Sequence, residues 1–376
     1  MRRSIAFTGL LAAASLSLAA CGGLDTGAST SSAAPTATSS AASSSAASSS
    51  AATSSAASGS SSAASSSAGS SSASSGGGAA AAAIPRPAAC DEASPYIAVA
   101  LPNLTNPYYV AMKQGFEDAG SAAGYTIEVQ IANDDDATQL GQVQAMLQKQ
   151  PCALALNAVK SEPAAAIVKA ANDAGVPVFT VNVTVDPDAL SSQGASIVQY
   201  LGADNAAGGR QIGEQVLKDL GADAAFKVGL ITEPDEIPVV VRDQGFKDAI
   251  APDANASVVA EVDGNVKPDV SLQATTELLQ GNPDVSVLFA STGPASYGAL
   301  QAIAGNANVK VYGFCASEEP LTDAYPACVA QEPADYGKRV VEQIQGWLGG
   351  GTPEAEILRP LKLFVNGETP APGEVG

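Results

Sequence analysis

The feature that most constrains the fold is a regular alternation of short apolar runs with amphipathic segments, from Tyr96 almost to the C-terminus. The apolar runs have the length and β-branched content of buried parallel strands, and the segments between them carry helical spacing. The strands predicted in the first half are residues 96–101, 126–131, 153–157, 178–183 and 197–202. The clearest helices there are residues 107–123 and 164–174. This is the pattern of one α/β unit.

The same rhythm restarts after residue 203 with a helix predicted at residues 205–220. Five further strands are predicted at residues 228–231, 258–262, 285–290, 309–314 and 328–331. About 285 residues of alternation exceed one comfortable core and predict two lobes. Each lobe is expected to be a doubly wound parallel sheet with its ligand site beyond the carboxyl ends of the strands. Two such lobes placed face to face would form a cleft.

The N-terminus has the features of a bacterial export signal. Arg2 and Arg3 precede an apolar run over residues 5–18, which is shorter than the roughly 20 residues of a membrane span. Leu18-Ala19-Ala20-Cys21 resembles a lipobox, which implies a signal peptide at residues 1–21 and a lipid-anchored Cys21. The alternative is an ordinary cleaved signal with an incidental cysteine. We expect an exported protein anchored to the outer face of the cytoplasmic membrane.

The segment at residues 22–89 is predicted to be a disordered linker. Up to about residue 83 nearly every residue is Ser, Ala, Gly or Thr, and Asp25 is the one charged residue there. Without branched or aromatic side chains, burial cannot offset a backbone entropy of roughly 1–2 kcal/mol per residue. The segment is therefore expected to be a flexible tether between membrane and folded domain.

Composition excludes several classes of function. The chain has 18 basic and 38 acidic residues and a formal net charge of −20, so it lacks the basic footprint that nucleic-acid binding needs. It contains no histidine, which removes Ser-His-Asp triads, Cys-His pairs and His-ligated zinc. We expect no catalytic residues, no metal and no cofactor.

Four cysteines besides Cys21 are expected to form disulfides, because an exported chain matures in an oxidising compartment. Three connectivities are possible. Cys90 precedes the first predicted strand and Cys152 the third, and these strands are neighbours in a 2-1-3 order. Cys315 and Cys328 lie close in sequence. We favour Cys90–Cys152 and Cys315–Cys328, and free buried thiols are the alternative.

Several short motifs, each weak alone, occur in an order that resembles the type I periplasmic binding proteins of the ribose-binding kind. The motifs are Pro102-Asn103-Leu104-Thr105-Asn106-Pro107-Tyr108-Tyr109, Gly175-Val176-Pro177-Val178, Asp204-Asn205 with Gly208-Gly209, Arg242-Asp243-Gln244-Gly245-Phe246, Asn282-Pro283-Asp284-Val285, Val311-Tyr312-Gly313-Phe314 and Ala330-Gln331. Together they extend over roughly residues 94–365. The resemblance implies two lobes joined by a hinge of three crossing strands.

By the same resemblance, the N-terminal lobe comprises residues 90–203 plus 332–360, and the C-terminal lobe residues 204–331 plus 361–376. The implied protein is a solute-binding lipoprotein of an ABC importer, which closes around a sugar or sugar-like polar solute and docks on the permease transmembrane subunits. We expect it to act as a monomer.

The first candidate ligand contacts lie where a strand meets a helix. Asn106 and Pro107 suit the N-cap and first turn of that helix without any ligand. Tyr108 and Tyr109 follow at once, and paired aromatic side chains there could cover the apolar face of a sugar ring. The resemblance implies that Asn106, Tyr108 and Tyr109 contact ligand, whereas the alternative is that the tyrosines belong to the core.

Arg242 lies three residues before Gly245-Phe246, where the family places an arginine that donates to ligand oxygens. Its planar fork suits vicinal hydroxyls or a carboxylate. As a residue of a wetted cleft, it is expected to contribute little to stability. Gln331, at a predicted strand end, matches another ligand-contacting position of the family.

Three positions depart from the sugar-binding pattern. Asn182 and Val183 stand where relatives carry Asp-Arg, Cys315 stands where they carry aspartate, and Ser291-Thr292-Gly293 stands where Asn-Asp is common. Asn182, Thr292 and Cys315 are therefore candidate ligand contacts of altered chemistry. Because carboxylates accept short hydrogen bonds from hydroxyls, we expect a ligand with fewer hydroxyl donors or with a negative charge facing Arg242.

Two other functions fit the same fold. A sensory receptor would present its closed form to a membrane kinase or chemoreceptor. A soluble repressor with this core is opposed by the export signal and by the lack of a basic helix-turn-helix segment.

Overall fold

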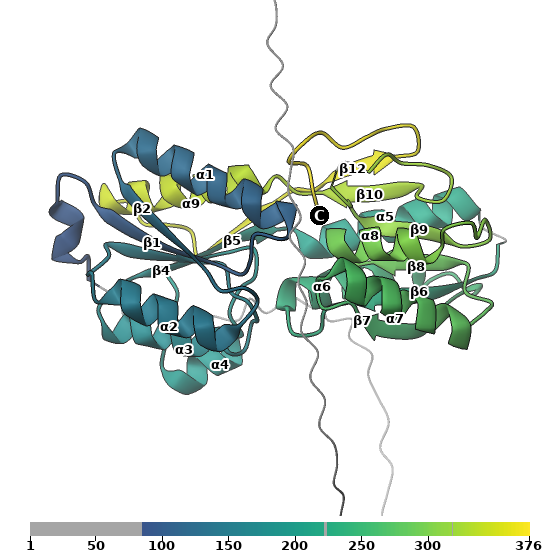
Figure 1. Cartoon of the computed structure of the whole chain (residues 1–376), viewed down its shortest axis with the longest axis horizontal. Helices are drawn as coiled ribbons and strands as arrows, with labels where there is room; N and C mark the ends of the chain where they lie inside the picture. Colours follow the sequence, from purple (N-terminus) through teal and green to yellow (C-terminus); the bar gives the residue numbers. More distant parts are fainter. Residues whose placement is uncertain (1–84, 222–223, 318) are drawn as a thin grey trace, which may run out of the picture. The chain divides into compact units, whose positions relative to one another are not determined.

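The computed structural model describes residues 85–221, 224–317 and 319–376 (Figure 1). The predicted signal peptide, Cys21 and most of the predicted linker lie outside these residues. Ala88–Asp91 forms a short 3-10 helix, η1, so the last two residues of the predicted linker are helical. The part of the chain that the structure describes contains no helix with the length and apolar character of a membrane span.

The first lobe is built on a six-stranded parallel sheet with the order β11-β5-β4-β3-β1-β2. Its strands are β1 (Tyr96–Leu101), β2 (Thr126–Ile131), β3 (Ala153–Leu156), β4 (Val178–Val181), β5 (Gln199–Ala203) and β11 (Glu356–Arg359). Its helices are α1 (Pro107–Ala123), α2 (Asp136–Leu147), α3 (Ala164–Asp173), α4 (Pro187–Gln193) and α9 (Pro333–Leu348). In Figure 1, α1 and α9 lie on one face of the sheet and α2, α3 and α4 on the other. The inner strands β1, β3 and β4 are almost entirely apolar, because both of their faces are covered.

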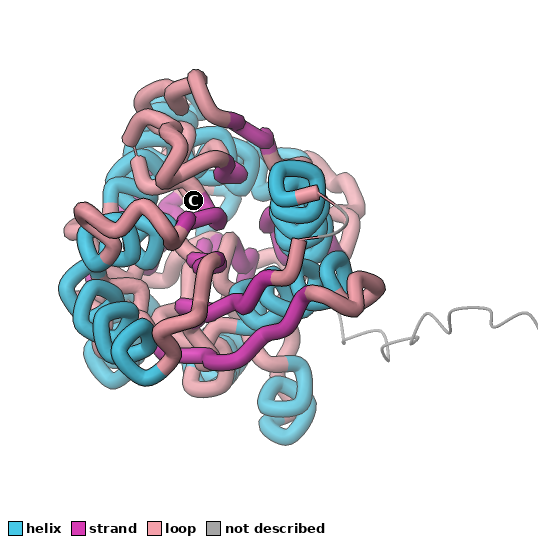
Figure 2. The backbone as a smooth tube through the Cα atoms, turned by 90° about the vertical axis from the view of Figure 1, so that its right-hand side faces the viewer, coloured by secondary structure: helices cyan, strands magenta, loops and turns pink. Residues whose placement is uncertain are grey.

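The second lobe is built on a sheet with the order β12-β10-β9-β8-β6-β7. Its strands are β6 (Phe226–Thr232), β7 (Ala256–Asp263), β8 (Val287–Ala290), β9 (Lys310–Phe314), β10 (Ala327–Ala330) and β12 (Lys362–Val365). Its helices are α5 (Asn205–Leu220), α6 (Ile237–Ile250), α7 (Pro268–Gly281) and α8 (Gly293–Ala302). Of its pairings, only β10 with β12 is antiparallel among the described strands. Figure 2 shows the strands of the lobe that faces the viewer lying between helices.

The chain passes between the two sheets three times: after β5, after β10, and between β11 and β12. Two of these crossings lie side by side, since the Asp204 amide donates to the Arg359 carbonyl at 2.8 Å. The predicted fold class, two doubly wound lobes joined by three crossing segments, is confirmed. All crossings therefore lie near one edge of each sheet, as a hinge requires.

Most predicted strands form within one or two residues of their expected bounds, and the deviations have local causes. β3 ends at Leu156, one residue earlier than expected, and β4 ends at Val181, because Asn182 turns the chain out of the sheet. Asn182 has φ of 60°, a left-handed conformation that asparagine tolerates better than most residues. β8 begins at Val287, two residues later than expected, and β11 and β12 were not predicted.

The structure forms both favoured disulfides, Cys90–Cys152 and Cys315–Cys328. Cys90 lies in η1 before β1 and Cys152 lies directly before β3, and β1 pairs with β3 in parallel. Adjacent parallel strands begin at the same edge of a sheet, which brings the two sulfur atoms together. The free-thiol alternative is not what the structure shows.

Close packing of α5 against α6 explains two motif glycines. A Cβ atom at Gly209 would lie 2.0 Å from the Arg242 carbonyl oxygen, and one at Gly245 would lie 2.3 Å from the Ala206 carbonyl oxygen. Neither helix could keep its position with a larger residue there. The glycines therefore set the depth at which α6 presents Arg242.

Candidate functional site

A small polar pocket lies where both sheets end, and it collects residues from both lobes. Seven of the eight predicted ligand contacts line it, namely Asn106, Tyr108, Tyr109, Asn182, Arg242, Thr292 and Gln331. Glu236, Val266 and Gly376 complete the lining. Most of these residues follow the carboxyl end of a strand, where ligand sites of doubly wound sheets occur.

Arg242 is held rigidly in this pocket although it is 4% exposed. Its Nε donates to Asn205 Oδ1 at 2.7 Å, and one terminal nitrogen, Nη1, donates to the Ser291 carbonyl at 2.8 Å. Its guanidinium carbon lies 4.0 Å from the centre of the Phe314 ring, a cation–π contact. Among the described residues, the other terminal nitrogen, Nη2, has no hydrogen-bond partner. Arg242 is thus fixed on one side and keeps donors for a ligand on the other.

Asp243, the residue after Arg242, places a buried carboxyl behind the site. This carboxyl accepts hydrogen bonds from the hydroxyls of Thr232 and Ser291. Burial raises the pKa of Asp243, and the two hydroxyls oppose that shift. Burial likewise lowers the pKa of Arg242. Ser291 therefore supports the site from behind, through its carbonyl to Arg242 and its hydroxyl to Asp243.

Tyr108 connects the two lobes inside the pocket. Its hydroxyl lies 3.0 Å from Asn182 Oδ1 in the first lobe and 3.0 Å from Gln331 Oε1 at the end of β10. A phenol has a single proton to donate, so one of the two amides must turn its N–H toward the tyrosine. Burial holds the pKa of Tyr108 well above its usual range, which keeps the hydroxyl neutral. The three side chains form a polar floor that a ligand hydroxyl could join.

The two tyrosines pack edge to face, with ring centres 5.4 Å apart and planes at 84°. They therefore offer one ring face and one ring edge rather than a parallel slot. Each is 3% exposed, and both belong to the core as well as to the pocket lining. Tyr108 and Tyr109 can therefore be core residues and ligand contacts at the same time.

Asn106 and Thr292 also serve as helix caps. Asn106 Oδ1 accepts from the Tyr108 amide at 3.0 Å, and Thr292 Oγ1 accepts from the Ala295 amide at 3.2 Å. Both caps use an oxygen atom as acceptor. The side-chain amide N–H groups of Asn106 and the hydroxyl proton of Thr292 can therefore still donate to a ligand. Both residues can therefore cap a helix and contact a ligand.

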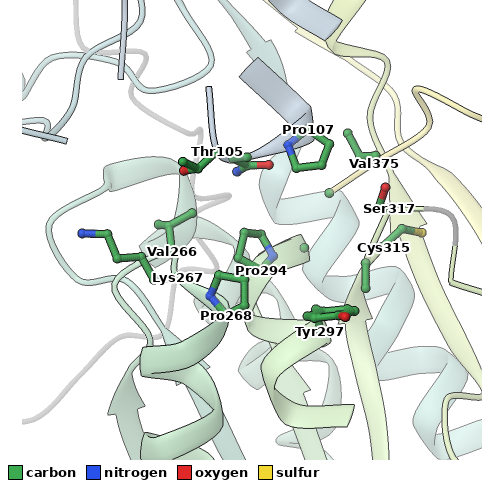
Figure 3. A pocket seen from close by; sticks show the side chains of 14 residues that line it. Thr105, Pro107, Val266, Lys267, Pro268, Pro294, Tyr297, Cys315, Ser317 and Val375 are labelled. Atoms are coloured by element: carbon green, nitrogen blue, oxygen red, sulfur yellow. The ribbon is translucent and has the colours of Figure 1, made fainter. Parts of the chain in front are cut away.

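Cys315 differs from the other predicted contacts, because its sulfur is bonded to Cys328 and it lines a second, larger cavity. This cavity has a volume of about 370 Å³, against about 20 Å³ for the polar pocket. Figure 3 shows Thr105 and Pro107 on one side of it and Val266, Pro268, Pro294 and Tyr297 on the other. The two spaces share Asn106, Val266 and Gly376, so they adjoin. The predicted polar ligand contacts are concentrated in the small pocket, whereas the larger volume lies in the adjoining cavity.

Glu236 is the charged residue of the site that the sequence analysis missed. It is the N-cap residue of α6, yet its side chain makes no capping hydrogen bond. It is 8% exposed and lines both the polar pocket and a third cavity of about 30 Å³ bounded by Asn103, Asp134, Lys160 and Glu233. Burial raises the pKa of Glu236 to about 8, and the nearby Glu233 adds to the shift.

Val266 lies where all three cavities meet. Its φ of 47° places a β-branched residue in the left-handed region, where such residues are rare. Conformations of this kind cost about 1–3 kcal/mol and gather at functional sites. The strain at Val266 is independent support for a functional role of this region.

Direct contacts between the lobes flank the site. The Ser161 amide donates to the Asp235 carbonyl at 3.0 Å, and the Ile237 amide donates to Ser161 Oγ at 3.0 Å. Lys160 Nζ lies 2.5 Å from Asp235 Oδ2. Ser161 follows β3 and Asp235 follows β6, so these bonds tie the first lobe to the second.

The side chains of the site are suited to recognising a polar solute. They combine an arginine, a buried carboxyl, amides and phenols, which are hydrogen-bonding groups. In the ranges that the structure describes, no group of three potential metal ligands is present.

Comparison with known proteins agrees with this geometry. Residues 97–352 match the family model described as periplasmic binding protein domain. The ribose import binding protein RbsB of Bacillus subtilis is 28% identical over 274 residues, covering 71% of this chain and 86% of that protein. The D-ribose/D-allose-binding protein of Pseudomonas aeruginosa is 28% identical over 291 residues, covering 72% and 89%.

Solved structures share the fold. An ABC transporter solute-binding protein from Mycobacterium smegmatis with bound glycerol has a TM-score of 0.67 at 20% identity, covering 75% of this chain and 99% of its own. One from Agrobacterium vitis, bound with α-D-tagatopyranose, has a TM-score of 0.66 at 23% identity, covering 72% and 95%.

Proposed function

This chain belongs to the periplasmic binding protein domain family, and from that premise we propose that it is an extracytoplasmic solute-binding protein of an ABC importer. It is a binding protein rather than an enzyme, as its relatives are. Its ligand is a sugar or a sugar-like small polar molecule. Ribose, allose and tagatose in the names of similar proteins support this class.

The observation that carries the proposal is the convergence of polar side chains from both lobes on one pocket. The first lobe supplies Asn106, Tyr108 and Asn182, and the second supplies Arg242 and Gln331. The lining combines hydrogen-bond donors and acceptors with the rings of Tyr108 and Tyr109. Such a mixture suits a ring with apolar C–H faces and a rim of hydroxyls.

We infer that ligand entry requires the lobes to separate. The polar pocket has a volume of about 20 Å³, which is room for about one water molecule and not for a sugar. Opening would break the bonds between Ser161 and residues 235–237 and would enlarge the polar pocket enough to admit a sugar. A ligand that bonds both lobes has higher affinity for the closed form and shifts the population toward it.

Thermal-shift screening tests the function. We expect at least one neutral pentose or hexose, among ribose, allose, tagatose, galactose and glucose, to raise the melting temperature. A ligand at 100 times its Kd stabilises by about 2.7 kcal/mol. Nucleotides and amino acids serve as controls that share polarity without the hydroxylated ring. A melting temperature that no sugar changes, at concentrations up to 10 mM, would contradict the proposal.

We propose that the first lobe comprises residues 90–203 plus 332–360, and the second lobe residues 204–331 plus 361–376. We also propose that the protein is a monomer and that its closed form docks on the permease transmembrane subunits. RbsB of Bacillus subtilis is an import binding protein, so a sensory role is not favoured.

We further propose that Cys21 carries a lipid anchor, on the strength of Leu18-Ala19-Ala20 before it. Cys21→Ser should move the protein from the membrane fraction to the soluble fraction, since a diacylated cysteine supplies the two chains that stable anchoring needs. The melting temperature should stay unchanged, because Cys21 lies far from the folded lobes in sequence. Cell fractionation with immunodetection measures the outcome. A Cys21→Ser protein that stays in the membrane fraction after a salt wash would rule out this anchor.

A further inference from the structure

Glu236 has a buried carboxyl that lacks a hydrogen-bond or ion-pair partner among the described residues. It follows β6 and is more than nine-tenths buried, and among the described residues no hydrogen bond or ion pair involves its carboxyl. It lines the same pocket as Arg242, Tyr109 and Gln331. A buried carboxyl without a partner costs free energy in the folded protein, and such groups cluster where a ligand supplies the missing bond.

The surroundings of Glu236 are negative. Glu233 is 4% exposed, its Oε2 has no partner among the described residues, and it lines the third cavity together with Asp134. Burial and the neighbouring Asp263 raise the pKa of Glu233 to about 7. Arg242 is the positive group that acts on Glu236, and it works against the pKa shift that burial and the acidic neighbours cause. The pocket thus presents a guanidinium donor and a carboxyl acceptor to the same small space.

We propose that Glu236 is a ligand-contacting residue that selects neutral, hydroxyl-rich sugars over sugar acids. The inference rests on the proposed function and names the ligand class of that same site. Asn182 and Cys315 lack the carboxylates that the resemblance led us to expect, and Glu236 supplies one from a different loop. An ionised carboxyl accepts hydrogen bonds from sugar hydroxyls, whereas it repels the carboxylate of a sugar acid.

This assignment revises the ligand expected from the sequence. A pocket that held only Arg242 would attract an anion, and a pocket without carboxylates would suit few hydroxyl donors. When ionised, Glu236 and Glu233 repel an anionic ligand near Arg242, and Lys160, which lines the third cavity, is already paired with Asp235. A neutral sugar can accept from Arg242 and donate to Glu236 at the same time.

Calorimetric titration of paired probes tests the assignment. The pairs are D-ribose with D-ribonate, D-galactose with D-galactonate and D-glucose with D-gluconate, at pH 8.5, where a carboxyl with a pKa of about 8 is mostly ionised. We expect the wild-type protein to bind at least one neutral sugar and to bind its acid at least tenfold more weakly. Glu236→Gln should weaken binding of the neutral sugar about tenfold, because a hydrogen bond to a charged acceptor is worth roughly 1.4 kcal/mol more than one to a neutral amide.

Glu236→Gln should also reduce the preference for the neutral sugar at least tenfold. Glu236→Asp, which keeps the charge but shortens the side chain, should weaken sugar binding and retain the preference. Glu162→Gln, the same substitution at an exposed residue, should change neither. Glu236→Gln should melt at or above the wild-type temperature, because an amide costs less to bury than a carboxylate.

The outcomes separate this inference from the proposed function. If neutral sugars bind Glu236→Gln as tightly as wild type, or if wild type binds the acid as tightly as the sugar, the role of Glu236 is wrong and the sugar-binding function stands. If wild type binds no neutral sugar of the series, the proposed function fails and the inference fails with it.

Discussion

Arg242→Ala should weaken sugar binding by roughly thirtyfold or more, because truncating a charged donor in a desolvated site commonly costs 2–5 kcal/mol at about 1.4 kcal/mol per decade. The structure shows why the effect should be large. Arg242 is fixed by Asn205, by the Ser291 carbonyl and by the Phe314 ring, and it lines the pocket. Isothermal titration of wild type and variant with the sugar found by screening measures the loss.

The same variant should also be less stable, which corrects the expectation drawn from the sequence. Arg242 is 4% exposed rather than wetted. Alanine would leave Asn205 Oδ1 and the Ser291 carbonyl unpaired, at a cost of about 1–3 kcal/mol for each group that stays buried. Arg242→Lys keeps a charge but loses the planar fork, so it should lose less stability and still bind weakly. Arg210→Ala, on an exposed face of α5, is the matched control and should change neither property.

If Arg242→Ala binds the sugar with wild-type affinity, the polar pocket is not the ligand site. Urea titrations of each variant, with and without sugar, keep the stability effect apart from the binding effect.

Replacing Cys90 and Cys152 together by alanine should lower the free energy of unfolding by about 4 kcal/mol. In the chain-entropy model the stabilisation grows with the length of the closed loop, and these cysteines are 62 residues apart. Cys315 and Cys328 are 13 residues apart, so their double alanine variant should lose about 3 kcal/mol. Guanidinium unfolding of the oxidised proteins measures both losses.

The mature folded protein should also resist alkylation at all four cysteines in the absence of reductant. A thiol that labels stoichiometrically at Cys315 would contradict the Cys315–Cys328 bond. Double variants with the unfolding midpoint of wild type would show that the bonds add no stability.

The best-predicted elements carry strong local signals. β1, β2, α1 and α5 have the expected bounds, because caps and turns mark them in the sequence. α1 begins after Asn106, whose side chain caps the Tyr108 amide, and ends at Gly124 with φ of 75°. Local chemistry of this kind is visible in the sequence because it does not depend on the rest of the fold.

β11 and β12 were missed because their local signals are weak. β11 is Glu-Ile-Leu-Arg with every second residue exposed, and it pairs only with β5 among the described strands. β12 joins the second sheet antiparallel to β10, in a short strand that includes one buried residue, Phe364. These strands are formed by tertiary pairing, which a short mixed pattern does not reveal.

Part of the site could be predicted from the sequence, because several of its residues lie in recognisable motifs. Tyr108, Arg242 and Gln331 lie in motifs with a recognisable order, and the structure gathers them. Glu236 lies in the segment Thr232–Glu236, which has three acidic residues and a proline, so that a surface loop is the ordinary expectation. It shares a cavity with Asp134 and Tyr109, which lie more than a hundred residues away and in the other lobe. A residue buried by the opposing lobe cannot be identified from its own neighbours in the chain.

A crystal structure with the sugar that gives the largest thermal shift tests the central claim most directly, because two adjoining cavities compete for the ligand. The account predicts a sugar that contacts both lobes in the polar pocket, within hydrogen-bond distance of Arg242, Gln331 and Glu236 and beside the rings of Tyr108 and Tyr109. A sugar bound only in the larger cavity, against Pro107, Pro294 and Tyr297 and without a bond to Arg242, would contradict it.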